Sequence, residues 1–379
     1  MGALIAMIVL LPVAILLALY IPIVQQAGAQ WLTTRLTEHV GMEIHAGEVR
    51  LQFPLRIKMQ DIQIGTHLSI GQLDCNIRLR PLRQGTIKAN YVDVRDITFR
   101  TDTSTVATQA SIAAQWFRVD DIAYHWREQT ARIRHILLAD GDAVLLAGSP
   151  PMESDTMSSR LPLSLSVNNI QLLRIGVSYT NGKTPLQGAV DEIALHAVSI
   201  DTTLSVALQN AEVKDGTFSF QDTKLTQLTA RADSLCYSPT GFTGRITQLA
   251  FNESHGMSLQ EGALTIDWSE GALSVPHLAL RTMHSSLNGQ LHTLGYGTSG
   301  ITIEGGADIR IGYADALLLS RWIGLPEEFA LHYPTQAISA SIALEGTEKQ
   351  LRIAQCHIAL PTAFDINLSG TVREFSTPQ

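Results

Sequence analysis

The sequence predicts a mostly β protein, with an N-terminal transmembrane helix followed by an elongated, curled antiparallel β-sheet, groove-like or taco-like, and few helices. Three observations support this fold class. The stretch from Gly2 to Val24 is apolar and uncharged, and the first charged side chain is Arg35. From residue 42 onward, apolar and polar residues alternate with the period of two that marks a strand with one wet face. Turn residues interrupt the alternation at short intervals, as in a meander.

The first 24 residues are expected to form a transmembrane anchor. About 20 apolar residues span the hydrocarbon core of a bilayer, which is about 30 Å thick, and residues 3–24 supply such a run. A cleaved signal peptide is the alternative, because the small residues Ala27, Gly28 and Ala29 follow the run. Both interpretations place the rest of the chain outside the cytoplasm, since long domains translocate largely regardless of their charge.

Residues 25–41 are expected to form an amphipathic helix, and residues 42–147 a first β region. Apolar residues recur three to five positions apart in the helical segment, and Gly41 stands where a helix C-cap is expected. Near the end of the β region, Asp140 and Gly141 predict a tight turn between two strands. The first β region therefore reads as a series of short strands joined by turns.

Residues 148–160 have the composition of an exposed loop, and the β pattern resumes over residues 161–379. The turn dipeptides expected to divide this second region into strands include Asn181-Gly182, Asp215-Gly216 and Glu270-Gly271. Residues 314–323 do not follow the β alternation, because Leu317 and Trp322 lie at helical spacing and Gly and Pro follow. We expect a single helix there, packed on the sheet or closing one of its ends.

The composition argues against one class of function and leaves the cysteines without an evident role. A net charge of −8 with only 16% charged residues argues against nucleic-acid binding, which needs clustered Lys and Arg. The three cysteines are far apart and form no CxxC pair, so we interpret them as small buried hydrophobes. They are Cys75, Cys236 and Cys356.

No residue pattern points to catalysis. His277, His284 and His292 are spaced by seven and eight residues, which fits neither a helical zinc motif nor a pair on one strand face. His284 and Ser285 are adjacent on a predicted strand, so their side chains point to opposite faces. We therefore expect no catalytic residues, no metal and no cofactor, and a protein that is not an enzyme.

Three stretches carry a resemblance to a known family. The phrase IHAGEVRLQFPLRIKMQDIQI, from Ile44 to Ile64, combines a strand, Gly-Glu-Val, and an aromatic residue plus proline before the next strand. Together with the phrases from Ser274 to Leu291 and from Cys356 to Gly370, it resembles TamB-like members of the AsmA superfamily, in the form seen in Bacteroidota. Members of that family are usually longer, so this chain is expected to be an N-terminal fragment.

The resemblance implies a location and a function. It implies a curled sheet anchored in the inner membrane by residues 3–24, single-pass, with the bulk of the chain in the periplasm. Phospholipid is then the expected partner, carried between the inner and outer membranes in support of outer-membrane biogenesis. The alternative is a non-enzymatic scaffold for outer-membrane β-barrel proteins. An anchored envelope enzyme acting on polysaccharide is disfavoured, because no carboxylate pair is placed for it.

Alternating apolar residues supply the candidates for a lipid groove, since burying a methylene is worth about 0.8 kcal/mol. A filled sandwich core would have the same sequence pattern. The candidates near the anchor are Ile44, Val49, Leu51, Phe53, Leu55 and Ile57. The candidates further along the chain are Phe218, Phe220, Ile266, Trp268, Leu278 and Leu280.

Overall fold

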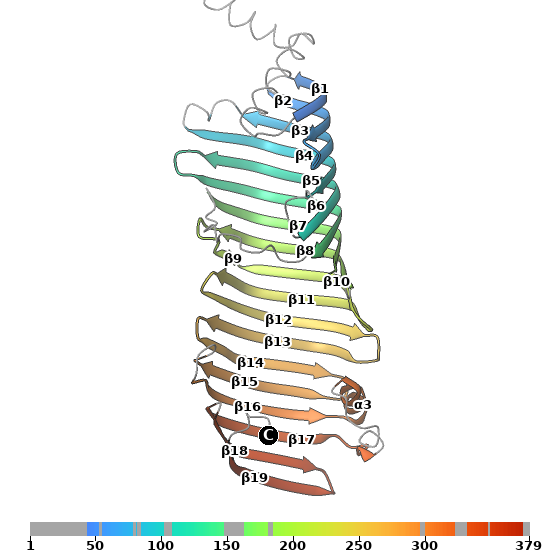
Figure 1. Cartoon of the computed structure of the whole chain (residues 1–379), viewed down its shortest axis with the longest axis vertical. Coiled ribbons are helices and arrows are strands. Elements are labelled where there is room, and N and C mark those ends of the chain that lie inside the picture. Colours follow the sequence, from blue (N-terminus) through green and yellow to red (C-terminus); the bar gives the residue numbers. More distant parts are fainter. Residues whose placement is uncertain are drawn as a thin grey trace, which may run out of the picture. The chain divides into compact units, whose positions relative to one another are not determined.

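The structure, a computed structural model, divides into two units built almost entirely of strands (Figure 1). Unit 1 comprises Met1–Ser158 and Pro162–Ala189, and unit 2 comprises Ser159–Leu161 and Val190–Gln379. The structure describes residues 44–52, 55–78, 81, 85–101, 108–147, 163–180, 185–295, 300–322, 332–347 and 349–373. The predicted anchor, amphipathic helix and loop at 148–160 lie outside these residues. The mostly β fold class is confirmed.

Seven strands make up unit 1. They are β1 (Ile44–Gln52), β2 (Arg56–Ile64), β3 (Leu68–Arg78), β4 (Thr86–Arg100), β5 (Thr108–His125), β6 (Thr130–Ala147) and β7 (Ser164–Thr180). Consecutive strands pair antiparallel from β1 to β6, as predicted. The pair β6 and β7 differs, because these strands run parallel. A parallel pair cannot be joined by a tight turn and needs a crossover connection. The residues between these two strands include the predicted loop.

Unit 2 contains the remaining strands and α3 (Tyr313–Trp322). Its strands are β9 (Val206–Leu208), β10 (Asn210–Phe220), β11 (Thr223–Ser238), β12 (Gly241–Glu253), β13 (Ser258–Ser269), β14 (Ala272–Thr282), β15 (Ser286–Leu294), β16 (Thr302–Ile311), β17 (Ile338–Thr347), β18 (Gln350–Leu360) and β19 (Phe364–Arg373). The boundary between the units falls within β8 (Pro185–Ile200). From β10 to β19 each strand pairs antiparallel with the next. The helix expected at 314–323 is confirmed as α3.

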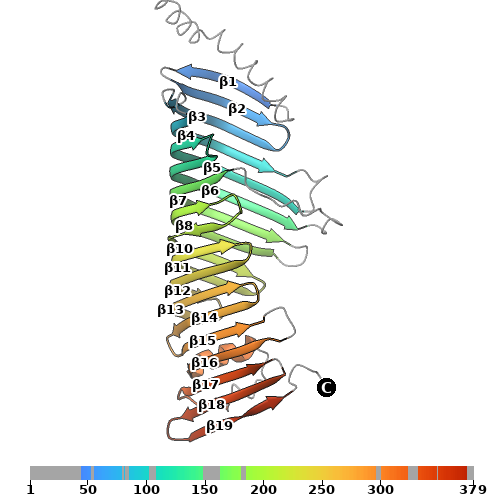
Figure 2. The ribbon, with the colours of Figure 1, turned by 90° about the vertical axis from the view of Figure 1, so that its left-hand side faces the viewer.

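A line of bend residues crosses all the strands of unit 1, whose ribbons curve along their length (Figure 2). A second, shorter line of stepped-over positions, at Asn90, Asp121, Arg134 and Asn168, crosses β4 to β7. On the longer line the register steps over one position per strand, namely Gly47, Asp61, Gly71, Asp96, Gln115, Asp140 and Arg174. Four of them have positive φ, between 51° and 54°. Aspartate enters this left-handed region more readily than most residues, because its short side chain can bond locally. The shared line makes the bends of neighbouring strands coincide.

The bends correct two of the expected turns. Asp140 and Gly141 lie inside β6, and Asp215 and Gly216 lie inside β10, so neither pair connects two strands. Asp140 and Asp215 have φ values of 54° and 49°, the conformation that a turn would also require. The dipeptides therefore specify a change of chain direction, and the strand continues beyond it. Glu270 and Gly271 do join two strands, β13 and β14, as expected.

A glycine faces the bend residue on the neighbouring strand at two places. A Cβ added to Gly71 would lie 2.9 Å from the Cβ of Asp96, and a Cβ added to Gly47 would lie 3.2 Å from the Cβ of Asp61. Atoms this close to a Cβ cannot simply rotate away, so one backbone would have to shift. Glycine at these positions therefore allows the strands to approach where both bend.

We predict that Gly71→Ala destabilises unit 1, because the added methyl group overlaps the side chain of Asp96. Overpacking of this kind costs about 1–3 kcal/mol. Thermal unfolding followed by circular dichroism should show a lower midpoint for this variant. Gly370→Ala is the matched control, since a Cβ there would meet nothing within 4 Å. Equal midpoints for the two variants would show that the bend tolerates a side chain.

Candidate functional site

Four rows of apolar residues cross the seven strands of unit 1 in register. Each row takes one residue from every strand, and each contains only apolar residues and glycine. The rows are Val49-Met59-Leu73-Val94-Phe117-Leu138-Leu172, Leu51-Ile57-Cys75-Val92-Val119-Ile136-Ile170, Ala46-Ile62-Ile70-Ile97-Ala114-Gly141-Ile175 and Ile44-Ile64-Leu68-Phe99-Ile112-Ala143-Val177. We refer to this set as the apolar face of unit 1. No polar residue interrupts it within the paired positions.

The apolar face of unit 1 is continuous across the line of bends. Two rows lie on each side of the line of bends. Each bend adds one residue to its strand, so the apolar side chains beyond the bend point to the same face as those ahead of it. Gly141 shows this directly. A Cβ added to it would lie 3.0 Å from Ile175 Cδ1, after the bend, and 3.8 Å from Leu138 Cδ2, before it. Side chains from both sides of the bend therefore meet on one surface.

Most of this face is only half buried. Val94, Val119 and Ile62 are buried, but Phe99 and Ile112 are 36% and 41% exposed. Most other side chains of the four rows are intermediate. Across the described ranges, the largest fully buried side chain is Val167. A filled sandwich core would bury rows of large side chains completely, so the described strands of unit 1 present an open apolar surface.

Unit 2 has an apolar face of the same design. One row crosses ten strands, β10 to β19, and two shorter rows flank it. The rows are Ala211-Ala232-Ile246-Leu264-Leu278-Gly289-Ala307-Ile342-Cys356-Leu368, Leu280-Leu287-Ile309-Ala340-Ile358-Ile366 and Val275-Leu291-Gly305-Leu344-Ile353-Gly370. We refer to them as the apolar face of unit 2. Ala232 is buried, whereas Leu291 and Leu368 are 36% and 53% exposed.

The candidates predicted near the anchor fall into two groups. Val49, Leu51 and Ile57 belong to the apolar face of unit 1 and are half buried. Leu55 instead lies in the turn between β1 and β2, where its carbonyl accepts a hydrogen bond of 3.0 Å from the Ile77 amide. Ile44 occupies a position in one row, but its side chain lies outside the described residues. Phe53 also lies outside them.

The candidates predicted further along the chain all lie in unit 2. Leu278 and Leu280 belong to its apolar face. On β13, Ile266 and Trp268 continue the alternation of Leu264, so they extend this face toward the end of the strand. Phe218 and Phe220 lie at the end of β10, opposite Leu225 and Thr223, and Phe220 is 43% exposed. These last two lie outside the three rows.

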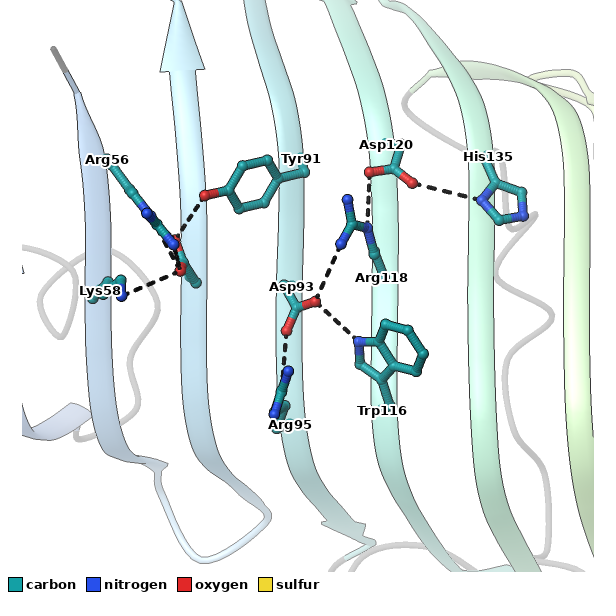
Figure 3. A network of polar contacts seen from close by, with 10 residues as sticks. Arg56, Lys58, Tyr91, Asp93, Arg95, Trp116, Arg118, Asp120 and His135 are labelled. Atoms are coloured by element: carbon teal, nitrogen blue, oxygen red, sulfur yellow. Dashed lines mark hydrogen bonds and ion pairs between the residues drawn. The ribbon is translucent and has the colours of Figure 1, made fainter.

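A network of polar side chains lies on the other side of the unit 1 strands (Figure 3). One half of it centres on Asp74. Arg56 donates from Nε and Nη2 to its carboxylate at 2.8 and 2.5 Å, and the Tyr91 hydroxyl donates at 3.2 Å. Lys58 Nζ lies 3.8 Å away. The Arg56 hydrogen bond lowers the pKa of Asp74 and outweighs partial burial, which raises it.

The other half of the network centres on Asp93, on the next strand. The Trp116 indole donates to Asp93 at 2.9 Å, and the Arg118 guanidinium lies 3.8 Å from it. Arg118 also donates to Asp120 at 2.9 Å, and the guanidinium carbons of Arg118 and Arg56 lie 5.6 and 5.9 Å from the ring centre of Tyr91. The two halves are thereby linked through an aromatic ring between two cations.

The sequence pattern did not predict this network. Its members are separated by up to 79 residues, from Arg56 to His135, because each strand contributes between one and three of them. The only signal in the sequence was the alternation of polar with apolar residues. This alternation predicts a solvent-exposed polar face, but it does not predict which polar side chains contact one another. Cross-strand register decides those pairs.

The described residues offer no obvious place for a metal ion or a membrane span. Within them, no three His, Cys, Asp or Glu side chains gather as a metal site requires. Their helices also lack the length and apolarity needed to cross a bilayer. The predicted span at residues 3–24 belongs to the part of the chain that is not described. The chemistry that the described strands offer is therefore apolar contact on one face and charge pairing on the other.

We predict that Asp74→Asn reduces stability at neutral pH and that the difference from wild type fades in acid. The folded-state pKa of Asp74 is depressed, so its contribution is present above the ordinary carboxyl value of about 3.9 and is lost as pH falls through the lower folded value. Urea unfolding at pH 7 and at pH 3 measures this. An unchanged difference at both pH values would show that Asp74 does not act through its charge.

No family model matches the sequence, and no curated protein matches it. The resemblance to TamB-like members of the AsmA superfamily thus stays a prediction that rests on the quoted phrases. One of these phrases, from Ile44 to Ile64, forms β1 and β2 and supplies the first two positions of every row of the unit 1 apolar face.

Proposed function

We propose that the apolar faces of the two units hold the acyl chains of phospholipids. In this proposal the protein is anchored in the inner membrane and carries or shields phospholipid between the inner and outer membranes, which supports outer-membrane biogenesis. The observation that carries the proposal is a wide, uninterrupted and half-exposed apolar surface on each unit, with the polar network around Asp74 and Asp93 on the reverse of unit 1. Apolar patches of this kind on a soluble surface usually mark a binding site.

The energetics favour an acyl chain as the ligand. Each methylene removed from water contributes about 0.8 kcal/mol, so about fifteen methylenes contribute on the order of 10 kcal/mol before the cost of ordering the chain. A long unbranched chain also matches the shape of the rows, because every row continues from strand to strand without a polar side chain. The lipid headgroup would remain at the border of the face, where polar residues and water are available.

A scaffold for outer-membrane β-barrel proteins is the second candidate, and one observation favours it. All ten residues of β19 are exposed, including Phe364, Ile366 and Leu368, and among the described strands β19 pairs with β18. A strand with an unpaired edge can add a strand from another protein. Under this alternative the edge of β19 would bind the partner and the apolar faces would carry no lipid.

We predict that Ile112→Glu removes phospholipid that co-purifies with unit 1. The side chain of Ile112 is 41% exposed on the apolar face, so glutamate there keeps access to water and places a charge where acyl chains would lie. Mass spectrometry of lipid extracted from the purified full chain measures the loss. Ser111→Glu is the matched control, because the adjacent residue points to the polar face.

The same pair of substitutions can be made in unit 2. Leu291→Glu places a charge on its apolar face, and Gln290→Glu places it on the polar face one residue away. We expect near-stoichiometric phospholipid on the wild type and on both controls, and less on each apolar-face variant. Equal lipid on all five proteins, or none on the wild type, would contradict the proposal and favour the scaffold.

The three native cysteines provide a second test. Cys75 and Cys356 belong to the apolar faces, whereas Cys236 is exposed opposite Thr243. Burial raises the pKa of Cys75, which lowers its thiolate fraction. We predict that a short-chain phospholipid slows maleimide labelling of Cys75 and Cys356 and leaves Cys236 unaffected, as measured by peptide mass spectrometry. Uniform slowing at all three thiols would contradict lipid binding on the faces.

A further inference from the structure

A hollow of about 970 Å³ lies at one end of the strands of unit 2. The last residues of β14 and β16, the first residues of β15 and β17, and the start of α3 line it. Figure 1 shows α3 beside these strand ends. The hollow is therefore at the rim of the sheet, where the apolar face and the polar face of unit 2 meet. None of the candidate residues predicted from the sequence lines it.

The hollow is cationic in a chain whose net charge is −8. Arg281, Arg310 and His284 line it, and its lining residues include no aspartate or glutamate. Arg281 is ion-paired with Glu261, outside the hollow, and that pair is exposed. Among the described residues, no carboxylate forms an ion pair with Arg310. Hydroxyl groups of Ser285, Ser286, Tyr313, Thr335 and Ser339 add further hydrogen-bonding groups around the two guanidinium groups.

The wall of the hollow between β14 and α3 is held by its own hydrogen bonds. Thr282 Oγ1 accepts the amides of His284 and Ser285 at 3.2 and 2.8 Å, and its hydroxyl donates to buried Asp315. The Gly312 amide donates to Ser285 Oγ at 3.0 Å. A Cβ on Gly312 would lie 2.6 Å from the His284 carbonyl oxygen, so only glycine permits this approach. A site fixed before binding loses less entropy when it takes a ligand.

The mouth of the hollow also has apolar character. Met283 and Tyr313 line it and are 74% and 40% exposed. A ligand with an anionic group in the hollow could therefore place an attached apolar portion against the rim.

We infer that this hollow binds a phosphate group through Arg281 and Arg310. Guanidinium groups bind phosphate oxygens with paired, charge-assisted hydrogen bonds. The phosphate can belong to a phospholipid headgroup or to a free phosphorylated anion, and the first source rests on the proposed function. The exposed Met283 and Tyr313 side chains favour the headgroup.

Isothermal titration calorimetry of the full chain with inorganic phosphate and with dihexanoyl phosphatidylglycerol tests this inference. Arg310→Gln should weaken binding by about tenfold or more, because a hydrogen bond to a charged group is lost. Arg281→Gln should act in the same direction, and both variants should unfold at the wild-type temperature because these side chains are exposed. Arg352→Gln is the matched control, since Arg352 pairs with Glu345 at 3.0 Å and does not line the hollow.

Tighter binding of the lipid than of inorganic phosphate, lost in Arg310→Gln, would support the headgroup as the source. Comparable binding of both, also lost in that variant, would support a free anion. Absence of binding to the wild type, or equal binding to Arg310→Gln and Arg352→Gln, would overturn the inference. Inorganic phosphate has no acyl chain, so its result is independent of whether the apolar faces hold lipid.

Discussion

The alignment of apolar side chains across neighbouring strands is the constraint on which the rest of the structure depends. A slip of one residue between any two strands would place the part of each row beyond the slip on the polar side. In unit 1 the register keeps four rows apolar over seven strands, and it also brings Asp74, Asp93 and Arg118 together on the reverse. The same pairing thus creates an apolar face and satisfies the charges opposite it.

The bends make that constraint harder to meet, because each one adds a residue to a strand. Unless neighbouring strands bent at the same register position, apolar residues of one strand would lie beside polar residues of the next on the same face. Asp96 on β4 and Asp140 on β6 share this line with Gly71 on β3, and Asp140 is also paired with Arg174 on β7 at 2.5 Å. Curvature and the continuity of the apolar face are therefore produced by one set of positions.

Alternation in the sequence was sufficient to predict a mostly β chain and the membership of Val49, Leu278 and Leu280 in apolar faces, and helical spacing was sufficient to predict α3. The sequence pattern did not predict the bends. An Asp-Gly pair allows a residue with positive φ in a hairpin turn and equally inside a strand such as β6. The parallel pairing of β6 and β7, the network around Asp93 and the cationic hollow depend on contacts between distant strands, which local patterns do not encode.

If phospholipid binds as proposed, its acyl chains lie on the apolar faces and nowhere else on the strands. Crosslinking the full chain with a phospholipid that carries a diazirine in its acyl chain, followed by peptide mapping, tests it most directly. We expect adducts on residues such as Leu138 in unit 1 and Leu278 in unit 2, and background levels at Asp93 and Arg118. Equal adducts on both faces, or none on the rows, would contradict the binding of acyl chains to the apolar faces.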